Sequence, residues 1–235
     1  MGDARNPTEW RETHFRIEGP AVLGLRAAFL TDWRDTDHPI TAADIEIDVP
    51  GAVGATTLAV VDGSAQIGVN DAERVLEALF SAAQNRIAIQ TPYFNPTEAI
   101  IDGIIDARRR GVDVDVLLPG PHIDKRISAV VAQDCYYPLI DEGVRVWVYQ
   151  PTMMHVKAML VDDEIAVIGS VNVNRRSVEK DEEVAVVVRD RDIGAELSAH
   201  FEQDIAASIP VSREDGPSIV ERAVAVMSKP IRAEM

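Results

Sequence analysis

The strongest constraint on the fold is an alternation of short apolar runs with longer amphipathic stretches in the middle of the chain. The apolar runs are rich in Val, Ile and Leu, and the stretches between them carry apolar residues at helical spacing. Because strand, helix and strand in succession build a parallel pair, this rhythm predicts an α/β fold. We expect a mixed, mostly parallel sheet with helices on both faces. The expected strands are 58–61, 86–90, 112–118 and 144–149, and the expected helices are 70–83, 96–110 and 127–141.

The pattern changes after Pro151. Two apolar runs, 156–161 and 165–168, flank the acidic residues 162–164, which favour a tight turn between antiparallel strands. The other elements expected in this part are a strand at 183–189 and an amphipathic helix at 193–208.

The ends of the chain differ from this central part. Residues 1–54 hold one expected helix, at about 20–34, and then a polar connection rich in Asp, Pro and Gly. Residues 55–210 would form the main folded unit. Residues 211–235 have the spacing of a further helix at 218–227, which would pack on the body or, less favourably, lie on a membrane surface.

Composition excludes several classes of protein. The net charge of −16 opposes a broad nucleic-acid footprint, because duplex affinity comes mainly from neutralised phosphates. The single cysteine, Cys135, allows neither an internal disulfide nor a cysteine-cluster metal site. No run of about 18 apolar residues is present, and the first residues lack the pattern of a signal peptide. We therefore expect a cytoplasmic protein without a transmembrane segment.

The segment that carries chemistry begins with His155 and Lys157. Residues two apart on a strand point to the same face, so the imidazole and the ammonium would stand side by side. An imidazole can attack phosphorus, and an ammonium can offset charge on phosphoryl oxygens. Taken alone, such a pair is more often a solvated surface feature of a strand edge.

The residues after the expected turn strengthen the functional interpretation. Gly169 permits a sharp exit from the second strand, and Ser170 and Asn172 can donate hydrogen bonds where the two strands end. The nearest other histidines are distant in sequence, and Lys157 would repel a cation, so we expect neither a metal site nor a cofactor.

The complete spacing resembles the HKD signature of the phospholipase D superfamily. It consists of His155, Lys157, Asp162, Gly169, Ser170 and Asn172. The surroundings, from about residue 55 to 207, resemble the bacterial cardiolipin synthase branch. The motifs that carry this likeness include Thr91-Pro92-Tyr93-Phe94, Gly111-Val112-Asp113-Val114, Leu117-Leu118-Pro119-Gly120 and Tyr149-Gln150-Pro151.

The resemblance implies that residues 55–210 form a catalytic half-domain with the phospholipase D-like sandwich fold. It also implies a role for each residue of the signature. His155 would be nucleophile or general acid, and Lys157, Asn172 and Ser170 would hold the phosphate. Glu183 matches a carboxylate that keeps the histidine in its working tautomer. Asp162 falls in the expected turn and is interpreted, with Gly169, as structural.

Family members normally carry two signatures whose histidines act together, and this chain carries one. Residues 10–33 resemble the segment that follows a first signature. We favour a truncated or half enzyme; the alternatives are a homodimer that pairs two copies of His155, and an inactive lipid-binding or assembly domain.

The resemblance implies phosphatidyl transfer from a phosphatidylglycerol-like donor, through a phosphohistidine, to an alcohol or to water. The implied partners are a phospholipid, the membrane surface to which the chain would be peripheral, and a second signature-bearing half, supplied by a homodimer or a missing N-terminal region. A nuclease is the runner-up from the same chemistry, but the acidic composition makes nucleic acid an unlikely partner.

Overall fold

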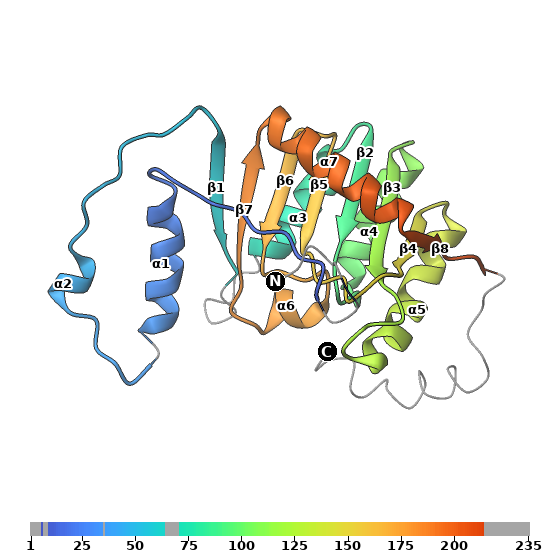
Figure 1. The fold of residues 1–235 in the computed structure, drawn as a ribbon, viewed down its shortest axis with the longest axis horizontal. Coiled ribbons are helices and arrows are strands. Elements are labelled where there is room, and N and C mark those ends of the chain that lie inside the picture. The colour runs from blue at the N-terminus through green and yellow to red at the C-terminus, as the bar shows by residue number, and fades with distance from the viewer. Residues whose placement is uncertain (1–5, 7–8, 35, 64–70, 214–235) are drawn as a thin grey trace.

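A computed structural model describes residues 6, 9–34, 36–63 and 71–213 of the chain. The described strands form an eight-stranded sheet in the order β1-β7-β6-β5-β2-β3-β4-β8 (Figure 1). The strands are β1 Thr57–Asp62, β2 Arg86–Gln90, β3 Asp113–Pro119, β4 Arg145–Tyr149, β5 Ala158–Val161, β6 Ile165–Gly169, β7 Val184–Arg189 and β8 Ser208–Pro210. The helices are α1 Val22–Trp33, α2 Ala42–Ile45, α3 Asp71–Ala82, α4 Glu98–Arg109, α5 Arg126–Asp141, α6 Arg175–Glu179 and α7 Arg191–Ala206.

The predicted α/β class is confirmed, but the expectation of a mostly parallel sheet is wrong. Strands β2, β3 and β4 pair in parallel as the alternating pattern predicts. The other neighbouring pairs among the described strands are antiparallel. The antiparallel turn between β5 and β6 was predicted, but the antiparallel pairings of β5 with β2, of β7 with β6 and β1, and of β8 with β4 were not.

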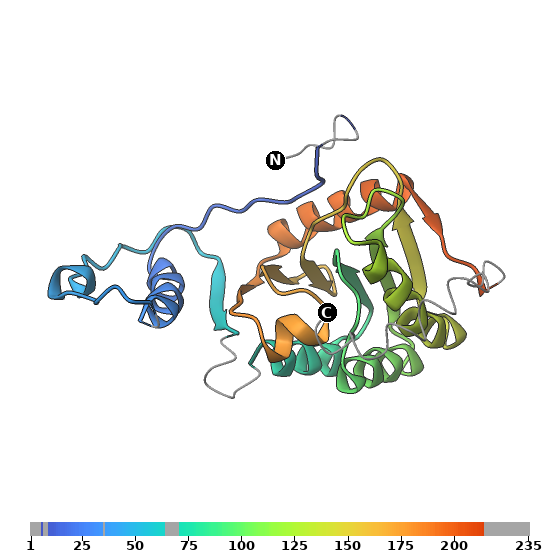
Figure 2. The same ribbon diagram turned by 90° about the horizontal axis from the view of Figure 1, so that it is seen from below.

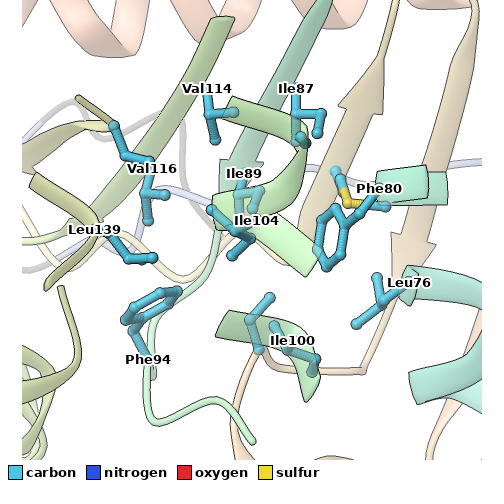
Figure 3. Packing of buried hydrophobic residues seen from close by; sticks show 14 of the residues in the cluster. Leu76, Phe80, Ile87, Ile89, Phe94, Ile100, Ile104, Val114, Val116 and Leu139 are labelled. Carbon is cyan, nitrogen blue, oxygen red and sulfur yellow. The ribbon is translucent and has the colours of Figure 1, made fainter. Parts of the chain in front are cut away.

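Helices cover both faces of the sheet, as expected (Figure 2). On one face, α3, α4 and α5 pack on β2 and β3 through side chains such as Phe80, Ile100 and Leu139, which are fully buried (Figure 3). On the other face, α7 packs through Leu197 and Phe201. Full burial of one such side chain stabilises the fold by about 1.5–3 kcal/mol. Two apolar cores therefore hold the sheet rigid between helical layers.

Several short elements were not anticipated. Helix α6, begun by an Asn174 side chain that accepts a hydrogen bond from the amide of Ser177, interrupts the path from β6 to β7. Strand β8 pairs antiparallel with β4 at the sheet edge, and α2 lies in the expected polar connection. The helix predicted at 218–227 lies outside the described residues.

The turn between β5 and β6 is built by Asp162 and Asp163. Both have positive φ angles, 52° and 53°, a region that L-residues other than Asn and Asp rarely adopt. The Asp162 carboxylate accepts hydrogen bonds from the amides of Gln84, Asn85 and Arg86 at 2.7–2.9 Å. This signature residue therefore ties the hairpin to the start of β2.

Replacing Asp162 with alanine is expected to destabilise the fold by about 2–4 kcal/mol, since it removes these bonds and leaves alanine at positive φ. Asp162→Asn should cost less, because asparagine tolerates this conformation. Urea unfolding of both variants measures the effect. An alanine variant as stable as the parent would show that the carboxylate does not hold the turn.

The same residue predicts a pH dependence. Burial raises the pKa of Asp162, but the amide hydrogen bonds outweigh burial and the pKa is lowered overall. Because the folded-state pKa lies below the unfolded value, the stabilisation is complete above pH about 4 and is lost as pH falls through the folded-state pKa. The stability gap between parent and Asp162→Asn should therefore close in acid.

Candidate active site

Residues 154–157 alternate between fully buried and half-buried side chains. Met154 and Val156 are 0% and 3% exposed, whereas His155 and Lys157 are half-buried and line an open cavity, which Val156 also touches. The His155 amide donates to the Arg11 carbonyl at 2.8 Å, and the Arg11 amide donates to the Met153 carbonyl at 2.8 Å. The segment before β5 is therefore held on one side by the sheet core and on the other by the N-terminal segment.

The His155 ring and the Lys157 ammonium are in contact. Nζ of Lys157 lies 3.2 Å from Nε2 and 3.3 Å from Nδ1 of the ring, and 3.2 Å from the His155 carbonyl oxygen. The cavity beside them has a volume of about 590 Å³ and also reaches Gly169 and Ser170. The predicted side-by-side placement of the imidazole and the ammonium is therefore present in the structure.

Ser170 follows β6 at the same cavity. Its hydroxyl accepts from the amide of Val184 at 3.0 Å and donates to the Val184 carbonyl at 3.4 Å. Gly169 is required by close approach, because a Cβ there would overlap the backbone of Val184 and Ala185. The absence of a side chain at Gly169 thus lets strands β6 and β7 approach each other closely where Ser170 faces the site.

Asn172 and Glu183 are joined through Ser177. The Asn172 amide donates to the Ser177 hydroxyl at 3.0 Å, and that hydroxyl donates to Glu183 at 2.6 Å. The amide oxygen of Asn172 is buried and has no hydrogen-bond partner in the described part of the chain. Burial raises the pKa of Glu183, and hydrogen bonds from Ser170 and Ser177 oppose that rise.

The carboxylate that contacts the histidine is Glu12, where the prediction had placed Glu183. Oε1 of Glu12 lies 2.9 Å from Nδ1 of His155. Burial raises the pKa of Glu12, but its contact with His155 outweighs burial and lowers the pKa overall. Sequence reasoning missed Glu12 because a partner 143 positions away leaves no local pattern.

Aromatic rings complete the walls around the histidine. The Trp10 ring centroid lies 4.6 Å from that of His155, and the Tyr93 ring meets it edge-on at 6.4 Å. Phe94 is 2% exposed and belongs to the core. His155 is therefore confined to one orientation, with its Nδ1 toward Glu12.

Burial and the Lys157 charge lower the pKa of His155, while Glu12 opposes that shift. Burial likewise lowers the pKa of Lys157, against the raising effect of Glu12, Glu183 and Asp124. The lowered pKa favours a neutral imidazole at pH 7. With its Nδ1 proton donated to Glu12, the lone pair is on Nε2, next to the ammonium.

Two properties of the described residues bear on other kinds of site. No three His, Cys, Asp or Glu side chains gather there in a way that could hold a metal ion. None of the helices in that part of the chain is both long and apolar enough to cross a membrane.

Comparisons with known proteins identify the family of the chain. A family model described as cardiolipin synthase, PLD-like domain matches residues 76–205. Cardiolipin synthase A of Pseudomonas aeruginosa is 35% identical over 225 residues, which cover 93% of this chain and 44% of that protein. The probable cardiolipin synthase YwiE of Bacillus subtilis is 32% identical over 204 residues, covering 86% of this chain and 40% of that protein. The chain belongs to the phospholipase D-like family, in its cardiolipin synthase branch, and spans less than half the length of these relatives.

Solved structures show the same fold. Nuc of Salmonella typhimurium, a phospholipase D family member, superposes with a TM-score of 0.57 at 18% identity, over 67% of this chain and 99% of Nuc. Phosphatidylserine synthase of Haemophilus influenzae gives 0.62 at 15% identity, over 77% of this chain and 48% of that protein. The predicted phospholipase D-like fold is thus confirmed.

Glu12→Gln is expected to lower the pKa of His155 further, because the variant removes the negative charge that opposes burial and Lys157. An NMR titration of the His155 ring measures the shift. Glu18→Gln is the control, since Glu18 pairs with Arg16 at an exposed position. Equal pKa values in the parent and Glu12→Gln would mean that the carboxylate does not interact with the ring in solution.

Proposed function

We propose that this chain supplies one half of a phosphatidyltransferase site that works through a phosphohistidine. The observation that carries the proposal is the contact between the Lys157 ammonium and Nε2 of His155, at 3.2 Å and beside an open cavity. Membership in the cardiolipin synthase branch supports a phospholipid, of the phosphatidylglycerol kind, as the donor.

In the first step, the Nε2 lone pair of His155 attacks phosphorus and the bond from phosphorus to the headgroup oxygen breaks. The departing alkoxide takes a proton from a general acid. Lys157 offsets the charge that develops on the phosphoryl oxygens, and the Ser170 hydroxyl can donate a hydrogen bond to the same group. In the second step an alcohol oxygen attacks phosphorus, the phosphorus–nitrogen bond breaks and a base removes the alcohol proton.

The positions of the other residues at the site support a separate role for each of them. Glu12 holds the ring through Nδ1, so Nε2 is the reacting nitrogen. Asn172 is buried, and its amide nitrogen is hydrogen-bonded to Ser177. Within this half we therefore assign the hydrogen bonds that link Asn172, Ser177 and Glu183 to positioning Ser170 rather than to direct phosphate contact. Direct contact between Asn172 and a phosphate would require these hydrogen bonds to rearrange.

The general acid and base of this reaction are assigned to a second signature-bearing half. That half could come from a second copy of this chain or from another polypeptide segment. Light scattering of the purified chain, with and without substrate, separates these sources. We place the reaction at a membrane surface, where a phospholipid donor would be available to a peripheral protein.

His155→Ala is expected to reduce phosphatidylglycerol cleavage or transfer by at least about 10³-fold, because the nucleophile is lost. Lys157→Ala should cost about 10²–10³-fold, as removal of one charge-stabilising donor does elsewhere. Chromatography of labelled lipid products measures both effects. His122→Ala, at an exposed position, is the matched control.

The same assay with single-stranded DNA tests the nuclease alternative. Cleavage of DNA alone by the parent, dependent on His155, would overturn the lipid assignment. Phosphatidylglycerol binding without turnover, at any protein concentration and with added second halves, would instead favour a lipid-binding domain.

Activity is also expected to fall in acid, because protonation removes the attacking lone pair of His155. Since the pKa of His155 is lowered from its usual 6.5, the acidic limb of the rate profile should lie below pH about 6.5. The pH dependence of kcat/KM measures this limb in the free protein. An acidic limb centred well above that value would contradict the assignment of His155 as the neutral nucleophile.

A further inference from the structure

A second cavity lies next to the candidate site. It has a volume of about 690 Å³ and lies between the N-terminal segment, the connection before β1 and the sheet. Its inner wall is apolar and consists of Leu58, Ile168, Val186 and Val188 of the sheet and Ile193 of α7. The proposed reaction uses none of these side chains.

The apolar wall follows from strand register. Ile168 of β6 pairs with Val186 of β7, and Val188 of β7 pairs with Leu58 of β1, so the four side chains form two adjacent cross-strand rows on one face. Helix α7 covers this face over the middle of the sheet through Leu197 and Phe201. Over β7 and β1 the covering layer is the N-terminal segment instead, which crosses that side of the sheet in Figure 1.

This covering layer is anchored but leaves space beneath it. Gly24 of α1 packs so closely on Val60 that a Cβ would lie 2.8–2.9 Å from that side chain. Ile17 and Leu25 pack against the same core. The gap between these contacts and the sheet is the cavity, bounded on its outer side by Pro20 and Ala21.

The two cavities adjoin each other and share lining residues. Phe15, Ile17, Ile168 and Val186 line both of them. One end therefore presents the His155 ring and the Lys157 ammonium, and the other presents the apolar wall. Arg16 and Glu18, which also line the apolar cavity, form an exposed ion pair with each other.

We infer that the apolar cavity binds an acyl chain of the phospholipid whose phosphate lies at His155 and Lys157. A cation at one end and an apolar wall along the other match an anionic phosphate with a hydrocarbon chain attached. Volumes of about 300–1,000 Å³ are typical of small-molecule sites. This inference rests on the proposed function, and it names the acyl chain as the part of the substrate that contributes binding affinity.

The test is the binding of phosphatidylglycerols of increasing chain length to the full chain by calorimetry. Dihexanoyl, diheptanoyl and dioctanoyl lipids would be used below their micelle-forming concentrations, with glycerophosphoglycerol as the headgroup alone. Each methylene buried in the cavity is expected to tighten binding about fourfold, which corresponds to about 0.8 kcal/mol.

Ala21→Trp is designed to fill the cavity from its outer wall, since Ala21 lines it. The variant is expected to abolish the dependence on chain length and to leave glycerophosphoglycerol binding unchanged. Ala27→Trp, the same substitution at an exposed position of α1, which begins directly after Ala21, should behave as the parent. Leu58→Trp fills the cavity from the sheet side and replaces Ala21→Trp if that protein does not fold.

The outcomes separate this inference from the proposed function. Headgroup binding with no dependence on chain length overturns the acyl site alone. Failure of every ligand to bind overturns both. Loss of a dimer in Ala21→Trp, with lipid affinity unchanged, would mean that a second copy occupies the cavity and would also overturn the inference.

Discussion

The site depends on one constraint, the burial of Met154 and Val156 on one side of the segment before β5. Both side chains are almost completely buried, so the residues between and after them must face the other way. A slip of one residue would place His155 and Lys157 in the core, where an unpaired ammonium would be strongly disfavoured. The Asp162 turn fixes the same register from the far end of the hairpin, because its carboxylate is bonded to the start of β2.

Electrostatics at the site oppose the overall charge of the molecule. The chain carries a net charge of −16, yet Lys157 is half-buried against a ring held neutral by its lowered pKa. Charges at the surface are screened beyond about 10 Å at 0.1 M salt, whereas groups inside a cavity act on one another directly. An anionic phosphate can therefore be attracted locally by a protein whose surface would repel it.

The features that could be predicted from the sequence are those that depend on a local pattern of residues. The strand at 86–90 matches β2 residue for residue, since apolar side chains and flanking turn residues define it locally. The side-by-side contact of His155 and Lys157 follows from a two-residue spacing. The antiparallel majority of the sheet and the partner of the His155 ring depend on contacts between distant segments, and Glu12 was missed for that reason. Glu183, assigned to the ring by resemblance, instead bonds to Ser177.

The N-terminal segment links the two parts of the site. Its Arg11 pairs with Met153 and His155 through the backbone and with Asp204 of α7 through a 2.9 Å ion pair. The same stretch of chain presents Glu12 to the ring and, a few residues later, covers the apolar cavity. The contacts that hold the His155 ring and the residues that cover the apolar cavity therefore belong to one continuous stretch, from Trp10 to Ala21.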